Sequence, residues 1–193
     1  DENCDSFINE TTVFPQSIGL ASTWNLDLVY KEAIAISDEA RALANTMDNY
    51  RYLNFWNPMI NIARDPRWGR TQEGYGEDPF LVSRIAVEYI KGLQGKDDKY
   101  IKAIASPKHF VANNVDGDRH FTNSKIDDKI LRDYYFPAFK SSIVEGKAQG
   151  LMSAYNSLNG VPCSSNDLLL NDILRNEWGF RGHVVSDCGA IYN

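Results

Sequence analysis

Apolar residues recur at helical spacing in the first half of the chain. The stretch WNLDLVYKEAIAISDEARALAN places them on one face, which predicts a helix over residues 26–45. Further along, Asp78 precedes Pro79, and Gly95 follows the last apolar residue of the next periodic stretch. A capping aspartate, a proline at the first helical position and a glycine after the end are typical of a helix with defined limits. We therefore expect a second helix between Pro79 and Gly95.

Two more helical patterns follow in the second half. Residues 127–146, DDKILRDYYFPAFKSSIVEG, carry Pro137 in the middle, which predicts a kink or a break there because proline cannot donate the backbone hydrogen bond. Residues 166–179, NDLLLNDILRNEWG, end at Gly179, which is a suitable helix terminator.

Short apolar runs separate these helices and are expected to be strands. They are YLNFWNP, YIKAIAS, GLMSAYN and GHVVSD. Strands and helices that alternate in this way imply right-handed crossovers and a parallel sheet. The runs are apolar throughout rather than alternating, as expected for a sheet covered on both faces.

Two parallel architectures fit this order. A doubly wound nucleotide-binding sheet needs a glycine-rich turn directly after a strand. The nearest candidate, EGYGED, has Gly74 and Gly76 but no third glycine, and its acidic residues would repel phosphate. The sequence therefore favours a partial (β/α)8 TIM-type barrel with parallel strands, in which residues 1–193 form an incomplete barrel domain.

Composition narrows the functional classes. The formal net charge of the 193 residues is -6, and no basic cluster is present, which argues against nucleic acid and anionic membranes as partners. No apolar run reaches ~18 residues, so no membrane span is predicted. Three cysteines give no paired metal-binding spacing, although a bridge between Cys163 and Cys188 is one possibility.

Polar side chains follow each predicted strand. Asn57 comes after the first, Lys108 and His109 after the second, Tyr155 after the third and Asp187 after the last. In a barrel, the carboxyl ends of the strands meet at the rim where active sites are built. A carboxylate among cationic donors suits a polyhydroxylated substrate, because the donors bind hydroxyls while the carboxylate attacks the carbon between them.

Several motifs in this order resemble one family. The segments NFWNPMINIARDPRWGRTQEGYGEDP, SPKHF, SAYNSLNGVPC and HVVSDC are similar to the N-terminal barrel domain of glycoside hydrolase family 3, and the resemblance extends from about residue 12 to the end of the chain. This family contains β-glucosidases, β-xylosidases and related exo-acting enzymes. The loop KHFVANN differs from the KHFPGHG-like loop of its hexosaminidase branch. The SDC form of the last motif leaves the choice between glucose, xylose and arabinose open.

The resemblance implies site residues and a reaction. Asp187 would be the nucleophile of a retaining mechanism, Arg70, Lys108 and His109 would bind sugar hydroxyls, and Tyr155 would lie beside the nucleophile. It implies neither a metal nor a cofactor. The expected substrate is an oligosaccharide or an aryl or alkyl β-glycoside, whose terminal non-reducing residue is released.

The same resemblance implies a larger polypeptide. A closed barrel needs roughly 250 residues, so we expect this chain to be a fragment. In the family the acid/base usually comes from a second domain, which would be the missing C-terminal partner of the same polypeptide. The stretch DENCDSFINE departs from the family pattern, so Asp1, Glu2 and Asp5 receive no role. We expect an extracellular or periplasmic location, with any signal peptide already removed.

Two other functions compete. Lys108 at a strand end would also suit a Schiff-base aldolase, if it were desolvated. The chain would alternatively be a non-catalytic sugar-binding fragment.

Neighbouring residues are expected to have supporting roles. Arg64 and Arg67 should form ion pairs within their loop, and Glu73 should support the site. Arg119 and His120 should lie near the rim. Trp56 and Trp68 would either stack on sugar or pack in the core.

Overall fold

Four parallel strand segments form an arc in which neighbours in space are also neighbours in the chain. The computed structural model describes residues 11–47 and 50–192. The strands of the arc are β1 (Asn54–Phe55), β2 (Ile104–Ala105), β4 (Gly150–Ser153) and β7 (His183–Ser186). β1 pairs with β2 and β4 pairs with β7, both in parallel.

Isolated parallel bridges continue the arc beyond the short strands. Met59 pairs with Lys108, and Phe110 pairs with Ser153, which joins the β2 segment to β4. In a doubly wound sheet the strand order reverses at a switch point. Here the order in space, β1, β2, β4 and β7, follows the chain without a reversal. The chain therefore folds as part of a (β/α)8 TIM-type barrel.

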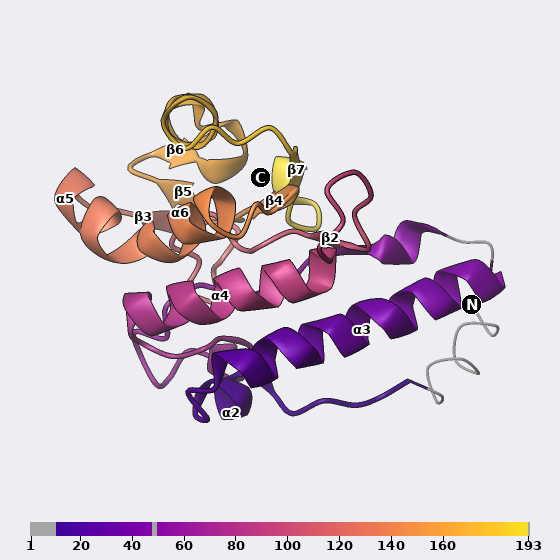
Figure 1. Cartoon of the computed structure of the whole chain (residues 1–193). Coiled ribbons are helices and arrows are strands. Elements are labelled where there is room, and N and C mark those ends of the chain that lie inside the picture. Colours follow the sequence, from indigo (N-terminus) through magenta and orange to yellow (C-terminus); the bar gives the residue numbers. More distant parts are fainter. Residues whose placement is uncertain (1–10, 48–49, 193) are drawn as a thin grey trace.

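Helices cover the outside of this arc. α3 (Leu26–Met47) and α4 (Pro79–Gln94) lie side by side along their length, and the short α2 (Ser17–Ala21) precedes them (Figure 1). Gly92 allows the close approach, because a Cβ there would lie 2.5 Å from the carbonyl oxygen of Tyr30. Both predicted helices are confirmed.

The limits of α4 follow the expected chemistry. Oδ1 of Asp78 accepts hydrogen bonds from the backbone N–H groups of Phe80 and Leu81, at 2.6 and 3.0 Å. Gly95 ends the helix with a φ of 81°, a conformation that favours glycine.

The third helical pattern breaks at its proline, as predicted. It consists of α5 (Asp128–Ile130), a π-helical turn (Leu131–Tyr135) and α6 (Pro137–Val144). The fourth pattern forms a π-helix over Leu168–Glu177, in which the N–H of Trp178 donates to the carbonyl of Ile173 at 2.9 Å. Apolar spacing predicted a helix there but does not distinguish this wider winding from an α-helix.

A small side sheet was not predicted. It contains β3 (Asn123–Ser124), β5 (Ser157–Leu158) and β6 (Val161–Pro162), with β3 parallel and β6 antiparallel to β5. Two-residue strands carry no alternation long enough to detect. Short 3₁₀ turns occupy Tyr50–Leu53, Thr71–Glu73, Cys163–Ser165 and Ala190–Tyr192.

The core lies between the arc and its helices. Phe110 is fully buried, and its ring centroid lies 5.1 to 5.9 Å from those of Phe136, Phe139 and Trp178. Cys163 and Cys188 are both free, so the bridge between them does not form. In the described part of the chain, no helix combines the length and apolarity that a membrane crossing requires.

Candidate active site

Asp187 directly follows β7 at the carboxyl end of the arc. Its backbone N–H donates to the carbonyl of Ser153 at 3.1 Å, which extends the strand pairing by one residue. The residue is only 7% exposed, and Oδ1 accepts a hydrogen bond from the N–H of Cys188 at 2.8 Å. The backbone thus places a carboxylate at the barrel rim and fixes one of its two oxygens.

His109 faces the other oxygen of this carboxylate. It lies on the continuation of β2, is 1% exposed, and brings Nε2 to 3.3 Å from Oδ2 of Asp187. Burial, reinforced by the charges of Arg70, Lys108 and Arg119, lowers the pKa of His109 to about 2. The imidazole is therefore neutral at physiological pH, and its contact with Asp187 is not an ion pair.

Arg70 reaches the same point from the long loop after β1. Its Nη1 lies 3.2 Å from Nε2 of His109, while Nε and Nη2 each donate to an oxygen of Glu73 at 2.8 Å. The hydrogen bonds to Glu73 raise the pKa of Arg70, and the charge of Asp187 adds to that effect. In return they lower the pKa of Glu73. This bidentate pair gives the guanidinium a fixed direction.

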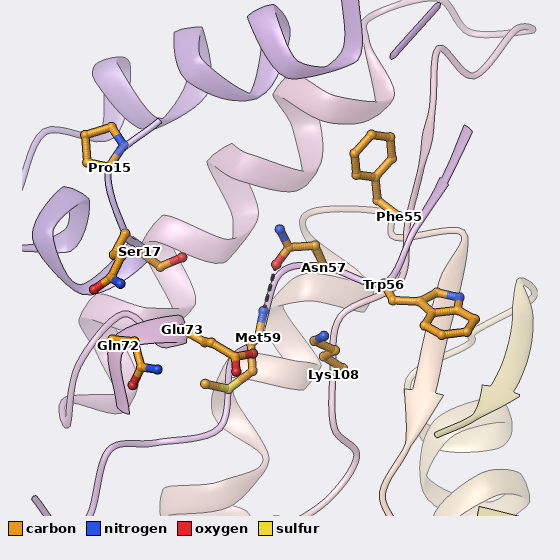
Figure 2. A pocket seen from close by; sticks show the side chains of 10 residues that line it. Pro15, Ser17, Phe55, Trp56, Asn57, Met59, Gln72, Glu73 and Lys108 are labelled. Atoms are coloured by element: carbon orange, nitrogen blue, oxygen red, sulfur yellow. Dashed lines mark hydrogen bonds between the residues drawn. The ribbon is translucent and has the colours of Figure 1, made fainter. Parts of the chain in front are cut away.

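Lys108 lines a neighbouring cavity of about 500 Å³. Figure 2 shows its side chain among Glu73, Met59 and Asn57, with Trp56 close by. Burial and then the charge of Arg70 lower the pKa of Lys108. The described residues that line this cavity do not include Asp187, so Lys108 and Glu73 connect it to the carboxylate cluster.

Tyr155 lies beside the carboxylate of Asp187. It is 8% exposed, and burial followed by the charge of Asp187 raises its pKa. The ring of His120 lies 4.4 Å from its ring, and Cζ of Arg119 lies 5.2 Å from its centroid. Arg119 and His120 thus hold Tyr155, in line with the supporting position expected for them.

The structure brings together the five residues chosen from the sequence. They are Asp187, Arg70, Lys108, His109 and Tyr155. Their roles stay predictions. Asp1, Glu2 and Asp5 lie outside the described residues.

Other candidates have structural roles. Arg67 pairs with Asp65 at 2.6 Å, as expected, whereas Arg64 lies over the ring of Tyr135 at 5.6 Å. Trp68 is buried in the core, but Trp56 is 44% exposed at the cavity. Among the described residues no group of three or more metal-ligating side chains gathers.

Sequence reasoning missed one residue of the site, Asn61. Its side chain is 3% exposed and makes three contacts with His109. The sequence did contain a signal for it: Asn61 is the one polar residue in the apolar run Met59–Ile62. A buried amide requires hydrogen-bond partners, so such a residue is expected to bind another part of the chain.

The cluster has a defined chemical capability. Oδ2 of Asp187 is buried and has no hydrogen-bond partner of normal geometry among the described residues. A carboxylate with one free oxygen can attack an electrophilic carbon, and the cations and hydroxyl around it can donate hydrogen bonds to nearby oxygens.

Comparisons with known proteins agree with this geometry. Residues 4–193 match the sequence profile described as "Glycosyl hydrolase family 3 N terminal domain". The chain is 42% identical to a xylan 1,4-beta-xylosidase from Xylanibacter ruminicola, over 95% of this chain and 23% of that protein. It therefore spans about a quarter of the length of this curated relative.

Solved structures share the fold. A GH3 exo-beta-xylosidase (XlnD), solved with a xylobiose aziridine activity-based probe, superposes with a TM-score of 0.90 at 34% identity, covering 94% of this chain and 24% of that one. DesR, a beta-glucosidase from Streptomyces venezuelae solved with D-glucose, gives a TM-score of 0.84 at 38% identity, covering 93% and 21%.

Proposed function

Since the chain belongs to glycosyl hydrolase family 3, we propose that its whole polypeptide hydrolyses terminal non-reducing β-D-glycosyl residues by a retaining mechanism. Asp187 is the nucleophile in this proposal. Arg70, Lys108 and His109 bind sugar hydroxyls, and Tyr155 lies beside the reacting carbon. A retaining mechanism uses two carboxyl groups roughly 5 Å apart, so a general acid/base from another part of the polypeptide completes the site.

The reaction takes place in two balanced steps. In the first, Oδ2 of Asp187 forms a bond to the anomeric carbon while the bond to the leaving-group oxygen breaks. That oxygen receives a proton from the general acid. In the second, water attacks the same carbon and loses its proton to that residue, now acting as a base, and the carboxylate of Asp187 leaves.

One observation carries the proposal. Oδ2 of Asp187 is buried at the barrel rim with no hydrogen bond of normal geometry to the described residues, and it lies 3.3 Å from the imidazole that Arg70 also contacts, while the hydroxyl of Tyr155 interacts with the same carboxylate. A buried carboxylate oxygen normally finds a partner, so one without a normal hydrogen bond is available to a substrate.

The sugar is proposed to be xylose or glucose. The relative from Xylanibacter ruminicola is named a β-xylosidase, and DesR is a β-glucosidase. The chain has higher sequence identity to the β-xylosidase, 42%, than to DesR, 38%, which favours xylose. Parallel kcat/KM measurements with 4-nitrophenyl β-D-xyloside and β-D-glucoside on the full polypeptide decide between the two.

The test of the hydrolase is the Asp187→Asn variant of the full polypeptide. The amide keeps the size of the side chain but is a poor nucleophile, so activity on the better glycoside should fall by roughly 10³-fold or more. The matched control is Asp65→Asn, which alters a loop carboxylate paired with Arg67. If the Asp187→Asn variant were as active as wild type, the assignment of Asp187 as the nucleophile would be refuted.

The 193-residue chain on its own should show negligible turnover, because the proposal places the proton donor outside it. If titration calorimetry detected xylose or glucose binding while the full polypeptide showed no turnover, the non-catalytic sugar-binding alternative would be favoured.

One observation also favours a second candidate. Burial lowers the pKa of Lys108, which is the direction that a Schiff-base lysine requires. Borohydride trapping of a carbonyl substrate on Lys108 would support an aldolase, and absence of trapping together with glycoside hydrolysis would exclude it.

A further inference from the structure

Asn61 holds His109 through both its backbone and its side chain. Oδ1 of Asn61 accepts from the backbone N–H of His109 at 2.8 Å, and Nδ2 donates to the carbonyl oxygen of His109 at 2.9 Å. The same Oδ1 lies 3.0 Å from Nδ1 of the His109 ring. Both residues are buried, so this arrangement is shielded from water.

The backbone contacts determine which way the Asn61 amide points. A backbone N–H only donates and a carbonyl only accepts, so the reversed amide would lose both hydrogen bonds. Oδ1 is therefore the atom that faces Nδ1. Because Oδ1 is only an acceptor, Nδ1 must carry a proton.

The tautomer decides what the second ring nitrogen offers. In a neutral imidazole with Nδ1 protonated, Nε2 is an acceptor. Nη1 of Arg70 lies 3.2 Å from Nε2 and is a donor, so these two atoms are matched. Oδ2 of Asp187 lies 3.3 Å from Nε2 with no proton between them, which explains why this oxygen makes no hydrogen bond to His109.

We propose that Asn61 is a positioning residue that fixes His109 in the Nδ1–H tautomer, so that Nε2 accepts from Arg70 and leaves Oδ2 of Asp187 free to attack. This inference rests on the proposed function only for the role of Asp187. It also changes the role of His109: in this tautomer Nε2 has no proton to donate to a sugar hydroxyl, and its single lone pair accepts from Arg70.

The opposite tautomer would be incompatible with the site. A proton on Nε2 would point toward Oδ2 of Asp187 and occupy its free lone pair, and it would oppose the N–H of Arg70. The charged groups that face the imidazole are Arg70 from the loop after β1, Lys108 beside it, Arg119 from the loop before β3, and Asp187 after β7. Three of the four are cationic and oppose protonation of the ring.

The first test is the pH dependence of kcat/KM for the Asn61→Asp variant of the full polypeptide. A carboxylate beside Nδ1 favours the imidazolium, whose Nε2–H then bonds to Asp187. The protonation of His109 that inactivates the site should therefore occur at a higher pH than in wild type, so kcat/KM of the variant should fall more at acid pH than at neutral pH. The Asn114→Ala control removes a side-chain hydrogen bond to the carbonyl of Ile62 and should leave the profile unchanged.

A merely structural role for Asn61 would lower activity equally at all pH values, and that result would overturn the proposal. So would an acidic limb identical to that of wild type.

The second test reads the tautomer directly and needs no activity. Solid-state NMR of the full wild-type polypeptide labelled with ¹⁵N-histidine, with His109 assigned by its absence in His109→Gln, should show Nδ1 protonated and Nε2 bare at pH 7. A protonated Nε2 would overturn the inference even if the enzyme hydrolyses glycosides. Conversely, the Nδ1–H tautomer in a protein without glycosidase activity would leave the tautomer assignment standing and refute only the proposed function.

Asn61→Ala provides a further variant if Asn61→Asp does not fold. It should populate both tautomers in the spectrum and lower kcat roughly tenfold with little change in KM. An unchanged single Nδ1–H tautomer in this variant would contradict the role of Asn61.

Discussion

The Glu73→Gln substitution tests how the orientation of Arg70 contributes to the site. Glu73 accepts two hydrogen bonds from Nε and Nη2 of Arg70, both at 2.8 Å, which directs Nη1 toward His109. Glutamine keeps one acceptor but presents an NH₂ group to the other guanidinium nitrogen. One charge-assisted hydrogen bond is therefore lost, and the negative charge that compensated the guanidinium of Arg70 is removed.

The magnitude follows from the exposure of the pair. A buried charge-assisted hydrogen bond contributes about 1.5–3 kcal/mol. The side chains of Arg70 and Glu73 are 21% and 39% exposed, so solvent screening reduces this value. We take about 1–1.5 kcal/mol, which corresponds to a loss of roughly 5–12-fold in kcat/KM.

The assay is the kcat/KM of the full polypeptide on an aryl β-xyloside or β-glucoside. Urea unfolding of the same samples shows whether the loss comes from the site or from reduced stability. The control is Glu88→Gln, which breaks an ordinary surface pair with Lys91. A folded Glu73→Gln variant with wild-type kcat/KM would refute the idea that Glu73 directs Arg70. A loss as large as that of Asp187→Asn would mean that Glu73 acts on the substrate itself.

Three further predictions concern stability, measured as urea unfolding of the full polypeptide. Removing the cap with Asp78→Ala should cost about 1 kcal/mol, because two backbone N–H groups lose their acceptor, and a cost below about 0.3 kcal/mol would contradict the cap. Gly92→Ala should cost about 1–3 kcal/mol, because the new Cβ meets the carbonyl of Tyr30 at 2.5 Å, and an unchanged midpoint would contradict that contact. The depressed pKa of His109 means that the unfolded state takes up a proton first as the pH falls below about 6.5, so stability should decline toward acid pH by up to ~1.4 kcal/mol per pH unit from this group. His109→Gln should reduce that slope, and an equal slope would show that another group causes it.

The helices of this fold are encoded locally, which is why the sequence predicted them well. Asp78, Pro79 and Gly95 define α4 through cap hydrogen bonds and backbone conformation. The break at Pro137 likewise follows from the missing donor of one residue. These signals do not depend on the rest of the molecule.

The strands were predicted in place but not in length. β1 and β2 have only two residues each, and the arc continues through isolated bridges such as Met59 to Lys108. Such pairing depends on neighbouring strands from distant parts of the chain, which local patterns do not record. The side sheet of β3, β5 and β6 was missed for the same reason.

In the candidate site, too, local patterns predicted some residues and long-range contacts determined others. Asp187, Lys108 and His109 were recognisable because each directly follows an apolar strand. Asn61 was missed because its importance comes from His109, 48 residues away in the sequence. A sequence pattern identifies a polar residue in an apolar run, but only the fold shows its partner.

The most direct test of the central claim is covalent labelling of the full polypeptide with a 2-deoxy-2-fluoro-β-xyloside or β-glucoside that bears a good leaving group. Mass spectrometry of the digested protein should find one glycosyl group on the peptide that contains Asp187, and the Asp187→Asn variant should remain unlabelled. A glycosyl group on a different carboxylate of an active enzyme would contradict the account.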